Sequence, residues 1–365
     1  MSRHRDVVRL LSEARPAQLD RGPSIDLATI TAFPQDAPAR KTNTRRLVLA
    51  AGLVPTAAAA AAVTVMIAQN PATPAPRPTV SQRPASTDKP ATAQQFLLVA
   101  AEQVAAGEAT TGRYWTVTTE HGETRQVGPK AGPYDIVLKM TAERWTASSP
   151  KDKSWEFYQS LGAAPATTAD KEAWERDGSP AQWTEPAPKG MKPVVIAAAG
   201  GPRRLRTPGG MGPRDYLLGG QPISPAALSA LPDDPAALKA YLVNRHKDTG
   251  GLEGRNDYLF NSADALVLEL PVTPGVRAAA YKLIAGLKGI TTLDTVTDQH
   301  GRKGVAVAYT RRGDAGTRSQ TRLIIDPRTG HALAEESWYL GARDKLMSYS
   351  LLVSAAWSDD APPAK

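Results

Sequence analysis

The sequence predicts an α+β protein with one transmembrane helix and an antiparallel sheet. Two observations favour this fold. Residues 47–68 form one continuous apolar run. Beyond it, segments with strand periodicity occur in two separate groups, at 113–160 and 291–357, with helical segments before the first group and between the two. Segregated runs of strands and helices are typical of α+β domains, whereas a parallel doubly wound sheet needs strict alternation.

The apolar run has 22 residues and no charge. As a helix it reaches about 33 Å at ~1.5 Å per residue, enough to cross a hydrocarbon core of roughly 30 Å. Arg45 and Arg46 precede it, and the first cation after it is Arg77. The positive-inside rule therefore predicts a single-pass plasma-membrane protein with a cytoplasmic segment at 1–46, a transmembrane helix at 47–68 and an extracytoplasmic remainder.

Two alternatives apply to this run. A buried helix of a soluble domain is disfavoured because 22 uninterrupted apolar residues exceed the usual core helix. A cleaved export signal is the other alternative, because residues 44–49 loosely resemble a twin-arginine signal and the alanines offer small-residue cleavage sites. The 46 residues before the run are long for a signal peptide, so a retained span is preferred while cleavage stays open.

The segments on either side of the span differ in character. Residues 3–15 (RHRDVVRLLSEAR) have apolar side chains at roughly helical spacing. They form either a frayed tail or a short amphipathic helix that folds on a cytoplasmic protein partner. Residues 16–44 are a linker. Residues 69–93 are rich in proline and predict an extended extracytoplasmic stalk.

The extracytoplasmic α+β domain is predicted at 94–358, followed by a tail at 359–365. Residues 94–109 suit an amphipathic helix. Three strands follow as an antiparallel meander, at 113–120, 134–147 and 153–160. The aromatic residues on strands are expected to pack the concave face of the sheet against helices; they are Tyr114, Trp115, Trp145, Trp155 and Trp338.

Residues 161–224 are predicted as irregular, with a helical turn at 173–175. The arginines at 203, 204 and 206 are interpreted as a solvated loop in preference to an anion site. Two helices then begin with matching signals, Asp234 before Pro235 and Thr273 before Pro274. Residues 263–270 predict a further helix between them, and Gly289 is expected to end the helix that begins at Pro274.

The C-terminal strands are predicted at 291–297, 303–310, 321–325 and 331–339. Turns at 298–301 and 326–330 contain glycine for positive φ and join them as hairpins. Residues 349–357 are predicted as a final edge strand.

Composition excludes several classes of function. The net charge of the 365 residues is +8, but it is spread along the chain, so no nucleic-acid partner is expected. The chain has no cysteine, which removes disulfides, thiolate catalysis and thiolate metal sites. It has no zinc-protease, P-loop, nucleophile-elbow or dinucleotide motif. His300 and His331 lie in predicted turns, where solvated side chains are expected.

We therefore predict a protein that is not an enzyme, with no catalytic, cofactor-binding or metal-binding residue and no cofactor. The residues that bind a ligand stay unassigned.

Several motifs resemble an uncharacterised actinobacterial family of single-span membrane proteins, named only after a locus tag and often encoded beside an extracytoplasmic-function sigma factor. They are GRYW at 112–115, LGA at 161–163, LPDDP at 231–235, PVTP at 271–274, RAAAY at 277–281, VTD at 296–298, GRKGVAV at 301–307 and IDPRTG at 325–330. The family has no established catalytic residues. The order of segments is also similar to the half-barrels of lipoprotein carriers and envelope-stress regulators, a likeness of architecture alone.

These features predict a non-enzymatic, membrane-anchored accessory or sensor protein, and the resemblance implies an association with a sigma factor. The alternative is an extracytoplasmic carrier whose half-barrel binds a lipid or another apolar ligand, with the N-terminus serving only as an anchor. An apolar cavity under the sheet favours the carrier, whereas a filled core favours the sensor.

Overall fold

The computed structural model describes residues 92–149, 151–185, 190–206, 216–248, 254–313, 316–360 and 362. The chain divides into two units, Met1–Ala85 and Ser86–Lys365, and the described elements belong to the second. The helix predicted at 3–15, the span predicted at 47–68 and the stalk up to residue 91 lie outside the described residues. Within the described ranges, no helix is both long and apolar enough to cross a membrane.

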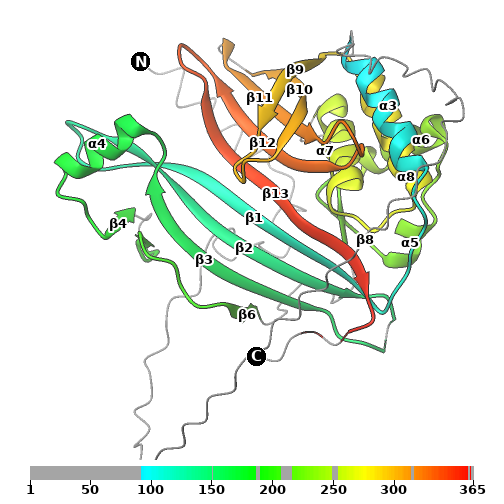
Figure 1. The fold of residues 1–365 in the computed structure, drawn as a ribbon, viewed down its shortest axis with the longest axis horizontal. Helices are drawn as coiled ribbons and strands as arrows, with labels where there is room; N and C mark the ends of the chain where they lie inside the picture. The colour runs from blue at the N-terminus through cyan, green and yellow to red at the C-terminus, as the bar shows by residue number, and fades with distance from the viewer. Residues whose placement is uncertain are drawn as a thin grey trace, which may run out of the picture. The chain divides into compact units, whose positions relative to one another are not determined.

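The predicted α+β class with a curved antiparallel sheet is confirmed (Figure 1). Nine of the described strands form one sheet in the order β6-β3-β2-β1-β13-β12-β11-β10-β9, and every neighbouring pair is antiparallel. The strands are β1 (Tyr114–Val127), β2 (Tyr134–Ala147), β3 (Trp155–Pro165), β6 (Arg204–Arg206), β9 (Ile290–Thr297), β10 (Lys303–Arg312), β11 (Arg318–Ile325), β12 (Ala332–Leu340) and β13 (Lys345–Ser358). The strand segments predicted on both sides of the helices are therefore confirmed.

The last strand corrects one prediction. Residues 349–357 were expected at an edge, but β13 lies in the middle of the sheet, between β1 and β12. Trp357 pairs with Trp115 on one side, and Ser348 pairs with Ser337 on the other. Both edges of β13 are thus hydrogen-bonded. Strand periodicity reveals that a segment is extended, but it does not reveal which strands lie beside it.

Six described helices complete the unit: α3 (Ala93–Ala105), α4 (Thr168–Arg176), α5 (Pro225–Ser229), α6 (Pro235–Lys247), α7 (Arg255–Leu268) and α8 (Pro274–Ala285). The predicted N-caps are confirmed, because Asp234 accepts from the amide of Ala237 and Thr273 accepts from that of Val276. Two boundaries were wrong. Helix α7 begins eight residues before the predicted 263, and α8 ends at Ala285 with Gly286 as its C-cap, before Gly289.

The region predicted as irregular, 161–224, contains two short hairpins besides α4 and β6. They are β4 (Gln182–Glu185) with β5 (Val194–Ala197), and β7 (Tyr216–Leu218) with β8 (Gln221–Ile223). Their strands have only three or four residues, too short for a periodic pattern to show in the sequence.

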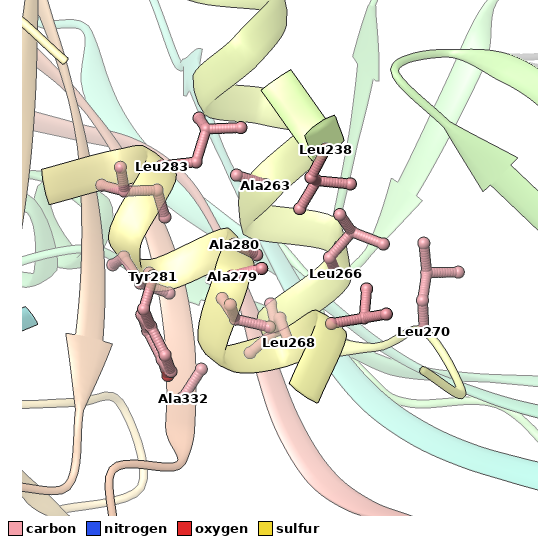
Figure 2. Close-up of a cluster of buried hydrophobic side chains, with 14 of the residues drawn as sticks. Leu238, Ala263, Leu266, Leu268, Leu270, Ala279, Ala280, Tyr281, Leu283 and Ala332 are labelled. Carbon is pink, nitrogen blue, oxygen red and sulfur yellow. The ribbon is translucent and has the colours of Figure 1, made fainter. Parts of the chain in front are cut away.

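The main hydrophobic core lies between the helices and one face of the sheet. Figure 2 shows part of it, where Leu238, Leu266 and Tyr281 come from three successive helices. All three side chains are completely buried. The sheet contributes apolar residues of β10, β11 and β12 to the same cluster. We call this side of the sheet the helix face.

Two smaller cores flank the main one. On the face opposite the helices, Ala306, Ile324 and Leu351 are buried around Tyr349. At the far end of β2 and β3, a third cluster includes residues of β2, β3, β4 and β5, with α4 packed against it; it contains Tyr134, Ile136, Ala163, Trp183 and Ile196. The sheet is therefore covered by side chains on both faces, which explains why its strands alternate poorly in burial.

The strand aromatics do not all pack against the helices as predicted. Trp115 does, in contact with Trp357 at 5.3 Å between ring centroids. Tyr114 is the next residue along β1 and points to the opposite face, where its ring centroid lies 5.9 Å from that of Trp145. Trp155 pairs with Trp145 in the register and shares this opposite face. The prediction was wrong for these three residues, because neighbouring side chains of a strand alternate between faces.

Candidate functional site

Helix α7 presents a row of polar side chains to the sheet. Asp257, Asn261 and Asp264 stand at positions i, i+4 and i+7, which places them on one side of a helix. The first two bind Arg311 of β10, whose Nε lies 3.1 Å from Asp257 Oδ1 and whose Nη2 donates to Asn261 Oδ1 at 2.8 Å. The helix is otherwise largely buried and apolar, so this polar row is an exception within the core.

Asp264 continues the row into the interior. Its side chain is only 4% exposed. Burial raises its pKa well above the ordinary value of 3.8, and the charge and hydrogen bond of Glu335 on β12 and the charge of Glu269 raise it further. A carboxyl group in this position holds its proton, because two ionised carboxylates cannot share a buried site without strong repulsion.

The sheet residues that face Asp264 form a lateral row across three strands. Glu335 of β12 pairs with Ser350 of β13, and Ser350 pairs with His121 of β1. Paired residues of an antiparallel sheet lie on the same face. Glu269, directly after α7, joins this row: Ser350 Oγ donates to its carboxylate at 3.5 Å, and Trp115 Nε1 donates to its carbonyl oxygen at 2.8 Å.

His121 closes the row on β1. Its Nε2 lies 2.7 Å from Thr119 Oγ1. Burial lowers its pKa below the ordinary value of 6.5, and Arg144 lowers it further, while Glu269 and Glu120 act in the opposite direction. The imidazole is therefore neutral near pH 7. We call the set Asp257, Asn261, Asp264, Glu269, Arg311, Glu335, Ser350 and His121 the α7 seam.

The opposite face carries a second polar arrangement, in which the turn between β9 and β10 is fastened to the centre of the sheet. Arg302 donates to the carbonyl oxygens of Leu352 on β13 at 2.8 Å and Leu333 on β12 at 2.9 Å. Its Nε also pairs with the fully buried carboxylate of Asp298 at 2.6 Å. One side chain thus connects a turn to two strands that are remote in sequence.

His300 of the same turn contacts β1. Its Nε2 lies 2.8 Å from Glu120 Oε2, and Tyr349 donates to Glu120 Oε1 at 2.7 Å. We call Glu120, Asp298, His300, Arg302 and Tyr349 the turn latch. His300 is exposed, as the sequence predicted, and its imidazole also binds the carboxylate of Glu120. His331 is exposed, as expected.

In the glycine-rich basic segment, Arg203 and Arg204 are exposed, as expected, but residues 204–206 form strand β6 instead of a loop. Arg203 stacks over the ring of Phe157 at 3.6 Å and donates to Glu143 at 2.8 Å. Its guanidinium is therefore held by the sheet. The side chain of Arg206 lies outside the described residues.

A binding cavity is not prominent among the described residues. One open surface depression of about 220 Å³ lies beside α4, lined by Pro129, Gly132, Pro133, Ala173, Arg176 and Asp177. In the described ranges, no three His, Asp or Glu side chains are arranged to hold a metal ion. Among the described residues, the α7 seam and the turn latch have distinctive chemistry: the seam brings carboxyl groups together around the buried Asp264, and the latch connects a turn to the sheet.

The sequence assigned no site residue, so both arrangements were missed. A signal for the seam was present, because Asp257, Asn261 and Asp264 recur at helical spacing within an apolar segment. Such a stripe normally indicates the solvent face of a helix. The latch left no local signal, because His300 and Glu120 are separated by 180 residues.

Comparisons with known proteins assign no family. No family model matches the chain, and no curated protein matches it. One similar solved structure is a chain of the Pseudomonas aeruginosa MucA/MucB complex, with 14% identity and a TM-score of 0.25. The match covers 75% of this chain and 59% of that one. That TM-score is too low to establish a common fold, so the fold is described from the structure of this protein alone.

Proposed function

We propose that this chain is a non-enzymatic, single-pass membrane protein that acts as an accessory or sensor, associated with an extracytoplasmic-function sigma factor. The N-terminal segment would lie in the cytoplasm and the α+β domain outside. The observation that carries the proposal is the order of segments: a basic-flanked apolar run of 22 residues, a proline-rich stretch, and then a folded unit whose first described helix begins at Ala93.

The packing of the domain favours the sensor over the carrier. A carrier needs an apolar cavity that opens to a ligand. Here the side chains of α6, α7 and α8 fill the space above the sheet, and Leu238, Leu266 and Ala280 are completely buried (Figure 2). We propose that the domain has the half-barrel architecture of envelope-stress regulators. The curved sheet with helices on one face supports this part of the proposal (Figure 1).

Topology can be tested cleanly because the chain has no cysteine. Ser12→Cys and Ser81→Cys would each introduce a single thiol, on opposite sides of the apolar run. In intact cells, a membrane-impermeant maleimide should label the Ser81→Cys variant, and label the Ser12→Cys variant only after permeabilisation. Labelling of both in intact cells, or release of the domain from washed membranes, would refute the retained span.

The partner can be tested with the full chain in detergent. An extracytoplasmic-function sigma factor of the same organism should be captured by the wild type. Leu11→Asp should weaken capture, because it places a charge on the apolar face of residues 3–15. Ser24→Asp, in the adjoining linker, is the matched control and should leave capture unchanged. Equal capture by all three chains, or none by the wild type, would leave the N-terminus as an anchor only.

A further inference from the structure

The α7 seam contains more negative than positive groups. Asp264, Glu269 and Glu335 approach one another between α7 and the sheet. The cation of the seam, Arg311, binds Asn261 one turn before Asp264 on the helix and Asp257 two turns before it. Among the described residues, no ion pair joins Asp264, Glu269 or Glu335 to a cation. A helix that packs on a sheet normally does so through apolar side chains. The negative charge of the carboxyl groups between α7 and the sheet therefore has to be neutralised by something other than a cation.

We propose that the seam is a proton-dependent contact: the buried Asp264 carboxyl group donates a proton to Glu335, and loss of that proton loosens α7 from β12. One shared proton lets two carboxyl groups remain in contact at a single negative charge. Without it, two carboxylates would face each other in a site that excludes water. Oδ1 of Asp264 is buried without a hydrogen-bond partner among the described residues, so no donor is in place to stabilise the second charge.

Other charged and titratable groups lie around the carboxyl pair on both the helix side and the sheet side. Glu269 adds negative charge beside it. Tyr281 of α8 is buried and donates to the carbonyl oxygen of Gly330. Burial raises the pKa of Tyr281, the charge of Arg277 on the same helix lowers it, and the charge of Asp264 raises it. On the sheet side, His121 of β1 is neutral and Arg144 of β2 lies beyond it. The groups that shift the pKa of Asp264 are Glu335 and Glu269, and no arginine is among them, so the carboxyl groups dominate its surroundings.

The sign of the effect follows from linkage. The pKa of Asp264 is raised in the folded state, so its favourable contribution is fully present below the unfolded value of 3.8 and is lost as pH rises through the folded value. Acid therefore tightens the seam and alkali loosens it. His121 acts oppositely, because its lowered pKa makes folding less favourable when pH falls below 6.5. A variant of the carboxyl pair, at Asp264 or Glu335, separates its contribution from that of His121.

The test compares the full chain in detergent with Asp264→Asn, which has nearly the same shape and cannot lose a proton. Equilibrium unfolding is measured from acid to mildly alkaline pH. The ratio of the wild-type unfolding constant to that of the variant should rise by up to tenfold per pH unit between 3.8 and the folded pKa. Glu335→Gln should likewise weaken the pH dependence of the unfolding constant, because it removes the second carboxylate. It provides the test if Asp264→Asn does not fold. Glu172→Gln, on the exposed side of α4, should follow the wild type.

Two further readouts detect the proton and the movement directly. Below the folded pKa of Asp264, the infrared carbonyl band of a buried protonated carboxyl group should be present in the wild type and absent from Asp264→Asn. Amide hydrogen exchange of α7, corrected for intrinsic rates, should accelerate with pH in the wild type but stay constant in the variant, with α4 as the internal reference. A missing band or a pH-independent ratio would overturn the inference. It concerns the folded domain alone, so it stands or fails separately from any sigma-factor association.

Discussion

Gly122 of β1 lies directly beneath the ring of Tyr349 on β13. A Cβ atom at Gly122 would lie 2.0 Å from Tyr349 Cε1 and 2.4 Å from Cζ, where nonbonded carbon atoms need about 3.5–4.0 Å. The ring is 4% exposed, and its hydroxyl donates to Glu120. In Gly122→Ala the ring therefore has to move, and its hydrogen bond to the carboxylate has to lengthen or break.

The expected cost has two parts. Overpacking a core costs about 1–3 kcal/mol, and a lost hydrogen bond to a charged group costs about 1.5–3 kcal/mol. With partial relaxation, we expect Gly122→Ala to lower the free energy of unfolding by roughly 2–5 kcal/mol. At about 2–4 °C per kcal/mol for a large domain, the melting temperature should fall by roughly 4–20 °C. Thermal unfolding followed by circular dichroism measures it.

Gly132→Ala is the matched control, since nothing lies within 4 Å of its Cβ position. It should be neutral or slightly stabilising, because alanine restricts the unfolded chain. The double variant Gly122→Ala with Tyr349→Ala should cost less than the sum of the single changes, because removing the ring removes the clash. Equal melting temperatures for the Gly122 and Gly132 variants would refute the placement of β13 beside β1.

Three other predictions test the latch and the core. Arg302→Gln should destabilise the domain by roughly 3–5 kcal/mol in denaturant unfolding, because it leaves the buried Asp298 carboxylate unpaired; Arg328→Gln should change little, since that arginine is 86% exposed. Burial alone would raise the pKa of Glu120, but the hydrogen bonds from His300 and Tyr349 lower it below the ordinary 4.5. Its contribution is present above 4.5 and is lost as pH falls through the folded value, so Glu120→Gln should flatten the acid limb of the stability–pH curve. Leu266→Ala should cost roughly 2–5 kcal/mol of unfolding free energy because the side chain is 0% exposed, whereas Leu217→Ala, 43% exposed, should cost under about 1 kcal/mol; similar losses for the two leucines would contradict the core assignment.

The features that the sequence determined are those set by neighbouring residues. Asp234 and Thr273 cap helices through amides three positions away. Gly301 and Gly330 adopt positive φ in the predicted turns. Such contacts join residues that are close in the chain, so short sequence motifs are enough to predict them. The α+β class follows in the same way, because it depends on the order of periodic segments alone.

The features that only the tertiary structure decided depend on residues far apart in the chain. The sequence of β13 predicts only a further strand at the C-terminus. Its pairing with β1 and β12 places it in the middle of the sheet. The polar row that begins at Asp257 has the periodicity of a solvent face, yet the sheet covers it. His300 lies in a predicted turn, yet Glu120 of β1 meets it across the opposite face. Periodicity records that one side of an element is polar, but the partner that covers that side is chosen by the packing of the whole chain.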